Sequence, residues 1–289
     1  MVDEQVASFG PGGRLTGILT VPTSGVRATA VLLLNAGVVH HVGPQRLWVT
    51  LARQLAGAGF HVLRFDHAGL GDSLHRDDGR PFEQSSLSDV ADAMAWVERS
   101  TTCRLFALVG LCAGTLTAFR VAQADPRITS LVLLTALLED PASVPEAVVA
   151  EAMDRRVGRS YVTQKAVSGE AWRRLLTGQV SAGRVLRTLG RTARPPAREG
   201  ALLRPGTEAA LDGLQAVLRR GTSVVFLFAE PTTVLEYFRM TIEPRLPALQ
   251  DAGRVSLSVL KGADHTFTTL RDQNRALETV SRWLEAECS

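Results

Sequence analysis

The chain has 289 residues, of which 45% are hydrophobic and 21% charged, and its formal net charge at pH 7 is +3. This length and apolar content suit one large domain with a substantial core, and so small a net charge does not indicate a nucleic-acid partner. Residues 1–5 are polar and do not begin a secretory signal, and the longest apolar runs are far too short to span a bilayer. Three cysteines without a C-x-x-C pair give no disulfide framework, which fits a reducing compartment. We therefore expect a cytoplasmic protein with no membrane span and no nucleic-acid ligand.

Strand-like apolar runs alternate with helical patterns along the first 140 residues. The expected strands cover residues 15–21, 28–34, 61–65, 105–109 and 128–134. The expected helices cover residues 45–57 and 87–99, and a third follows residue 112. Ser86 or Ser88 is available to cap the helix at 87–99. Continuous apolar strands separated by helices predict a mostly parallel sheet with helices on both faces.

The pattern changes between residues 141 and 220, where no strand-like run appears and glycine and proline interrupt helical segments. Alternation then resumes, with strands expected at 223–228 and 255–260 and helices at 234–240 and 274–287. We expect an α/β fold in which residues 1–140 and 221–289 form the sheet domain. Residues 141–220 are then an inserted helical cap.

The strand at 105–109 leads into Gly-Leu-Cys112-Ala-Gly, a G-x-nucleophile-x-G pattern with cysteine in place of serine. In this pattern a sharp turn between a strand and a helix presents the nucleophile, and Gly110 and Gly114 leave the neighbouring elements room to approach. The helix N-terminus that follows favours a thiolate. The alternative is an inert core thiol, because cysteine is among the most buried residue types. Cys103 and Cys288 have no histidine near them in the sequence, and we expect both to be bystanders.

A thiol nucleophile needs a base, and His265 is the strongest candidate among the six histidines. It follows the last expected strand and precedes the final helix. Loops at the carboxyl ends of parallel strands share one edge of a sheet. We therefore expect the imidazole of His265 to meet the thiol of Cys112 at that edge.

Four segments carry a resemblance to a known family. They are LLNAGVVHHVGPQRL (33–47), VLRFDHAGLGDS (62–73), the turn at Cys112 and the loop of His265. With them the chain resembles the α/β-hydrolases over nearly its whole length. More narrowly it resembles the bacterial hydrolases found with exosortase systems and related cytoplasmic tailoring hydrolases. This fold implies an oxyanion hole formed by the backbone N–H groups of Val38 and Ala113.

The sequence does not identify the acid that would orient the histidine base. Relatives in the resembled group commonly place an aspartate near the position that Thr232 holds here. Glu230 and Glu236 are equal candidates in its place, and Asp264 and Glu139 are weaker ones. A Cys–His pair without an acid is a further alternative, because a thiol is far more acidic than a serine hydroxyl.

His40 and His41 lie in the same loop as Val38. We expect His40 to line the pocket and bind substrate, with a pair of surface histidines as an equal alternative. Residues 66–73 lack both G-x-G-x-x-G spacing and a P-loop Gly-Lys-Ser/Thr, so we expect a structural role for them. No H-E-x-x-H motif or clustered cysteine and histidine spacing suggests a metal, and we expect neither a metal nor a cofactor.

An S-acyl cysteine is a thioester, which can pass its acyl group to water, amines, alcohols or other thiols. We therefore expect an acyl-processing enzyme, a thioesterase or esterase or else an acyltransferase, acting on a small biosynthetic intermediate through Cys112, with His265 as general base. One alternative is a lyase-type tailoring enzyme in which His265 drives elimination of an acyloxy group. Another is a catalytically degenerate hydrolase-fold binding protein.

Arginine and lysine residues crowd the segment 155–198, where Glu170 is the only acid between the first and last arginines. The segment around Trp172 also looks like the cap of the resembled bacterial hydrolases. A basic run of this kind is either a solvated face or a docking surface for an anionic partner. The second possibility would suit an acyl donor bound to a carrier protein or to coenzyme A.

Overall fold

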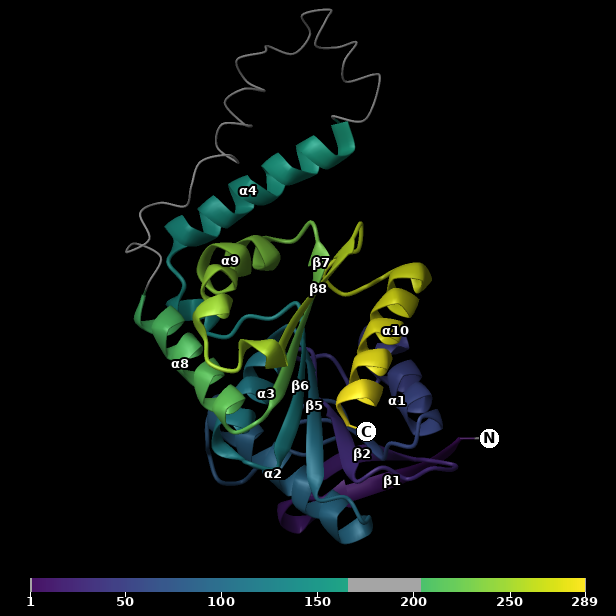
Figure 1. Cartoon of the computed structure of the whole chain (residues 1–289). Helices are drawn as coiled ribbons and strands as arrows, with labels where there is room; N and C mark the ends of the chain where they lie inside the picture. Colours follow the sequence, from purple (N-terminus) through teal and green to yellow (C-terminus); the bar gives the residue numbers. More distant parts are fainter. Residues whose placement is uncertain (1, 166–203, 289) are drawn as a thin grey trace, which may run out of the picture.

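The computed structural model of the chain describes residues 2–165 and 204–288. At its centre is an eight-stranded sheet with the order β1-β2-β4-β3-β5-β6-β7-β8 (Figure 1). The strands are β1 (Asp3–Phe9), β2 (Leu15–Val21), β3 (Thr29–Leu33), β4 (Val62–Phe65), β5 (Leu105–Leu111), β6 (Ile128–Leu134), β7 (Ser223–Glu230) and β8 (Val255–Lys261). The six strands from β4 to β8 run parallel, and β1 and β2 form an antiparallel edge. The expected α/β fold with a mostly parallel sheet is confirmed.

Helices cover both faces of the sheet (Figure 1). On one face lie α1 (Leu47–Gly57) and α10 (Leu270–Glu287). On the other lie α2 (Phe82–Ser100), α3 (Ala113–Ala124) and α8 (Pro205–Arg219), and α9 (Thr233–Thr241) adds to the same core. All residues of β3 and β4 are buried, as expected for strands that are covered on both sides.

Two details differ from the sequence-based expectation. The first strand, β1, was not expected, because only Ala7 and Phe9 of this antiparallel edge strand are buried and its apolar alternation is weak. The expected caps of α2, Ser86 and Ser88, are also wrong. The helix begins five residues earlier, after Pro81, and Ser86 is buried inside it.

Parts of the expected cap at 141–220 lie within the described residues. Helix α4 (Glu146–Lys165) crosses above α9 and packs on it through Ala152 (Figure 1). Helix α8 instead places Ala210 and Leu214 in the main core beside α3, so it belongs to the layer that covers the sheet. Residues 166–203, which include most of the basic segment, lie outside the described residues.

The parallel strands bring several loops to one edge of the sheet. Cys112 follows β5, Thr135 follows β6 and His265 follows β8, so all three lie at the carboxyl ends of their strands. This is the edge at which open α/β sheets bind their ligands. Within the described ranges, no helix has the length and apolar character needed to cross a membrane.

Candidate active site

Cys112 occupies the sharp turn between β5 and α3. Its backbone has φ 53° and ψ −120°, a strained conformation for a residue other than glycine. Its N–H donates to the carbonyl of Leu134 at 3.0 Å, and its carbonyl accepts from Thr115 Oγ1 at 2.6 Å. The side chain is exposed. The alternative of a buried core thiol therefore does not hold for Cys112.

The two glycines of the turn are required by close backbone approaches. A Cβ at Gly110 would lie 2.5 Å from the carbonyl oxygen of Gly114. A Cβ at Gly114 would lie 2.5 Å from the carbonyl oxygen of Asn35, in the loop after β3. The turn is thus packed against the loop that contains Val38.

A cavity of about 440 Å³ opens beside the turn, and both Cys112 and His265 line it. Much of its wall is apolar and comes from Phe82, Ala113, Leu116, Leu137, Pro141 and Val234. The structure therefore places these two residues, which lie far apart in the sequence, on the wall of one cavity. An apolar cavity with a few polar groups is the usual form of a small-molecule site.

The imidazole of His265 is half-buried in the loop after β8. Burial lowers its pKa below the ordinary value, against a smaller opposing effect of the Asp264 carboxylate. A lowered pKa keeps the ring neutral near pH 7, which is the form that accepts a proton.

Thr135 is a residue of this site that the sequence did not reveal. Its hydroxyl donates to the backbone carbonyl of His265 at 3.3 Å, and its N–H donates to Leu227 at 2.7 Å. It is buried, lines the cavity and has φ 52°. A positive φ is a genuine outlier for a β-branched residue, and such strain clusters at functional sites. Only its place directly after a central strand could have pointed to it.

The two leading acid candidates both pair with Arg239. Its Nη1 lies 2.8 Å from Glu230 Oε1 and 2.9 Å from Glu236 Oε1. Neither glutamate lines the cavity of Cys112. In the part of the chain that the structure describes, no carboxylate is hydrogen-bonded to the ring of His265. Thr232 caps α9, where it accepts a hydrogen bond from the N–H of Leu235 at 3.3 Å.

The weaker acid candidates are also engaged elsewhere. Glu139 lines the cavity, but its Oε1 accepts hydrogen bonds from Arg204, Thr207 and Tyr237. The carboxylate of Asp264 accepts from backbone N–H groups of its own loop, at 3.0 Å from Thr266 and 3.1 Å from Thr268.

The groups expected to form the oxyanion hole are free to donate. Val38 and Ala113 are both exposed, and among the described residues neither backbone N–H donates to another backbone group. The N–H of Ala113 belongs to the first residue of α3, and the first N–H groups of a helix have no partner within it.

A family model described as the alpha/beta hydrolase fold matches residues 30–203, more than half of the chain. The chain belongs to the α/β-hydrolase fold family. Several solved structures share the fold. The α/β hydrolase GrgF from Penicillium sp. sh18 is 18% identical with a TM-score of 0.57, covering 100% of this chain and 99% of its own. The Pyrococcus furiosus esterase PF2001 is 14% identical with a TM-score of 0.59, covering 100% and 92%.

A third structure, dienelactone hydrolase from Anabaena variabilis, is 14% identical with a TM-score of 0.56 and covers 100% of this chain and 99% of its own. At these identities the likeness shows the fold alone. No curated protein matches the chain.

In this hydrolase-fold chain, His40 and His41 do not line the cavity of Cys112. His40 Nε2 lies 3.0 Å from Asp72 Oδ2, and His41 Nδ1 lies 2.7 Å from Asp66 Oδ2. Burial would raise the pKa of Asp66, but hydrogen bonds from His41, the N–H of Asp72 and Asn35 hold it below its ordinary value. The structure thus places His40 beside the carboxylates of Asp66 and Asp72 and not among the residues that line the cavity.

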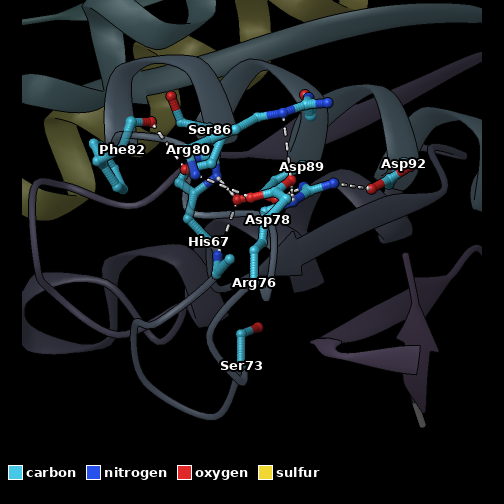
Figure 2. Close-up of polar contacts among 12 residues, drawn as sticks. His67, Ser73, Arg76, Asp78, Arg80, Phe82, Ser86, Asp89 and Asp92 are labelled. Carbon is cyan, nitrogen blue, oxygen red and sulfur yellow. Dashed lines mark hydrogen bonds and ion pairs between the residues drawn. The ribbon is translucent and has the colours of Figure 1, made fainter. Parts of the chain in front are cut away.

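An ion-pair network supports the cavity wall that α2 supplies (Figure 2). Asp89 of α2 is fully buried, pairs with Arg76, accepts from the N–H of Ala68 at 2.9 Å, and lies 3.4 Å from Nδ1 of His67. The ring of His67 packs edge-on against Phe82, which lines the cavity. The network therefore fixes the loop after β4 to the helix that carries Phe82.

The cysteines outside the site have ordinary surroundings. Cys103 is buried, and its Sγ lies 3.5 Å from Nδ1 of His61, a histidine that is 42 residues away in the sequence. Burial raises the pKa of the Cys103 thiol, and it does the same for Cys288. Raised values disfavour the reactive thiolate.

Proposed function

We propose that this α/β-hydrolase-fold protein is an acyl-processing enzyme that works through an S-acyl Cys112, with His265 as general base. The observation that carries the proposal is the common cavity. An exposed thiol on a strained turn and a half-buried imidazole of lowered pKa line the same apolar space. A nucleophile and a base on one cavity wall are the minimum set of catalytic groups for acyl transfer.

The reaction begins when His265 takes the proton of the Cys112 thiol. The thiolate attacks the carbonyl carbon of an ester or thioester, and the N–H groups of Val38 and Ala113 stabilise the oxyanion. The leaving alkoxide or thiolate departs with the proton that His265 holds, and an S-acyl Cys112 remains. His265 then deprotonates water or another acceptor, which attacks the thioester, and the Cys112 sulfur leaves and regains a proton.

The ion pairs of Glu230 and Glu236 with Arg239 favour a Cys–His pair that works without a carboxylate as its third member. A thiol needs less help than a serine hydroxyl, because it already ionises near neutral pH. In this proposal the orientation of His265 depends on its own loop and on the hydrogen bond from Thr135. The assignment of a glutamate as the acid stays a prediction that substitution can test.

The substrate that suits the cavity is a small apolar acyl group joined through an ester or a thioester. The lining residues Leu116, Leu137 and Val234 offer an apolar surface to the acyl chain. Such a role agrees with the tailoring hydrolases that the sequence resembles, and a donor bound to a carrier protein or coenzyme A remains part of the proposal. Both hydrolysis and transfer follow from the same S-acyl intermediate.

Intact-mass measurement after brief incubation with activated acyl esters and acyl-CoA tests the proposal. We expect one acyl adduct on the wild-type chain, its loss in Cys112→Ala and its retention in the matched control Cys288→Ala. The His265→Ala variant should form the adduct slowly. Turnover that persists in Cys112→Ala but not in His265→Ala would indicate elimination with His265 as base. No adduct and no turnover in the wild type with any ester or thioester would indicate a binding protein.

A further inference from the structure

Four side chains from two neighbouring loops converge outside the cavity of Cys112. They are His40 and His41 of the loop after β3, and Asp66 and Asp72 of the loop after β4. One ligand atom from each lies within 4.8 Å of all the others. We propose that these residues form a binding site for a divalent transition-metal ion, with Zn²⁺ as the natural occupant.

The distances between the ligand atoms agree with this assignment. His41 Nδ1 and Asp66 Oδ2 are 2.7 Å apart, His40 Nε2 and Asp66 Oδ2 are 3.4 Å apart, and His40 Nε2 and Asp72 Oδ2 are 3.0 Å apart. Zinc bonds of about 2.0–2.2 Å in a tetrahedron place neighbouring ligand atoms roughly 3.4 Å apart. These three distances are within about 0.7 Å of that spacing, and all four ligand atoms lie within 4.8 Å of one another, so small side-chain movements would let them surround an ion.

Half of the site is rigid before any ion binds. The side chain of Asp66 is fully buried and that of His41 is 5% exposed. Asp66 Oδ1 accepts from Asn35 Nδ2 at 2.8 Å and from the N–H of His41 at 2.7 Å. Its Oδ2 faces the two imidazoles and also accepts from the N–H of Asp72 at 3.1 Å. Hydrogen bonds of this kind orient ligands in known metal sites.

The other half is open to solvent, and an ion can reach it. The side chain of His40 is 38% exposed and that of Asp72 is 60% exposed. Gly71 lets this loop approach, because a Cβ there would lie 2.2 Å from Asp66 Oδ2 and 2.7 Å from His40 Cδ2. The loop therefore lies directly against the cluster, and only glycine fits beside Asp72.

The chemistry of the donor set suits a dication. Two carboxylates neutralise a 2+ charge, and two neutral imidazoles are preferred ligands of zinc and its neighbours. Nδ1 of His40 accepts from the N–H of Val42 at 3.2 Å, and this contact must open when Nε2 of the neutral ring binds an ion. Four protein ligands close a tetrahedral site, which indicates a structural ion and not a catalytic one.

The site has a consequence for the loop after β3. His40 lies two residues beyond Val38, whose side chain is 83% exposed. An ion held by His40 and His41 would fix the backbone of this loop, and with it the N–H of Val38. This inference does not depend on the proposed acyl chemistry.

Isothermal titration of the full, chelator-treated chain with Zn²⁺ tests the site, and the visible bands of bound Co²⁺ report its geometry. The Cys112→Ala background removes the exposed thiol as a competing ligand. We expect one ion per chain, with affinity at least tenfold weaker in His40→Gln and in Asp72→Asn. His75→Gln changes an exposed histidine of the same loop as Asp72 and should bind as before.

Because both ligand variants change exposed residues, they should fold, and a melting temperature measured without metal checks this. A rise in melting temperature with Zn²⁺ that disappears in Asp72→Asn would support the site. Absence of saturable binding to the Cys112→Ala chain would overturn the proposal and leave a hydrogen-bond network alone. Binding that His40→Gln and Asp72→Asn leave unchanged would overturn it as well. Neither outcome bears on acyl adduct formation, so the two proposals fail separately.

Discussion

Thr135 Oγ1 donates a hydrogen bond to the backbone carbonyl of His265 at 3.3 Å, which joins the end of β6 to the loop after β8. The N–H of Thr135 donates to the carbonyl of Leu227 in β7, the strand that lies between β6 and β8. Thr135 directly follows β6, the neighbour of the strand that leads into Cys112, and thus links that part of the sheet to the loop that carries the imidazole. Glu230 and Glu236 both pair with Arg239. Within residues 2–165 and 204–288, the contact with Thr135 is the side-chain hydrogen bond that joins His265 to another element.

Replacing Thr135 by valine removes the hydroxyl and keeps both the β-branch and the cost of the positive φ. The lost hydrogen bond is worth about 1 kcal/mol, which corresponds to roughly a fivefold fall in kcat/KM if it acts on the transition state. We expect this fall together with a small drop in melting temperature. Thr135→Ser keeps the hydroxyl and should recover the activity. A valine variant with wild-type kcat/KM would show that the contact is dispensable.

The activity should depend on pH through the lowered pKa of His265. Because burial disfavours the imidazolium, the acid limb of kcat/KM should lie below the ordinary histidine value of 6.5. Activity is then present above that limb and is lost as the pH falls through it.

Asp264→Asn tests the assignment of His265 through the direction in which the acid limb of kcat/KM moves. The carboxylate raises the pKa of His265, so its removal should move the acid limb to still lower pH. The amide oxygen can still accept from the N–H of Thr266, which preserves the loop. A limb that moves to higher pH, or one above 6.5 in the wild type, would contradict the assignment of His265.

The central sheet and the turn at Cys112 were predictable because local signals and the fold agree there. Apolar strands, a G-x-C-x-G turn and a histidine after the last strand are all visible in the sequence. The edge strand β1 was missed because most of its side chains face solvent. Local sequence carries no information on a contact such as the one between Thr135 and His265, which are 130 residues apart.

The partners of His40 were missed for a related reason. Motif spacing finds ligands that lie close together in the chain, but Asp66 Oδ2 meets His41 only because β3 and β4 are neighbours in the sheet. The partners of Glu230 and Glu236 were equally hidden, because the sequence does not show that Arg239 on α9 reaches both. Whether charged side chains near the start of a helix pair with one another depends on their rotamers and their burial, and a sequence pattern does not determine either.

The role of the glutamates can be tested directly. If His265 works without an acid, Glu230→Gln should keep kcat/KM within about threefold of the wild type, whereas loss of an essential triad carboxylate costs about 10⁴-fold in well-studied enzymes. Glu236→Gln should likewise keep most of the activity, with some loss of stability because Glu236 is buried and bound to Arg239. A fall of a thousandfold or more in either variant, with the fold intact by circular dichroism, would identify the acid.

Asp89 supports the cavity wall, and its loss should be costly. Asp89→Asn removes the buried partner of Arg76, which keeps its pairs with Asp78 and Asp92, so the cost should lie at or below the lower end of the about 3–5 kcal/mol for breaking a buried ion pair on one side. We expect a large drop in melting temperature and weaker binding of acyl substrates, because the network holds the segment that carries Phe82 (Figure 2).

The matched control is Asp92→Asn on the same helix. Its carboxylate is 32% exposed and 3.4 Å from Arg76, so the cost should stay near or below 1 kcal/mol. Equal effects of the two substitutions in thermal unfolding would show that burial of Asp89 is not what stabilises this wall.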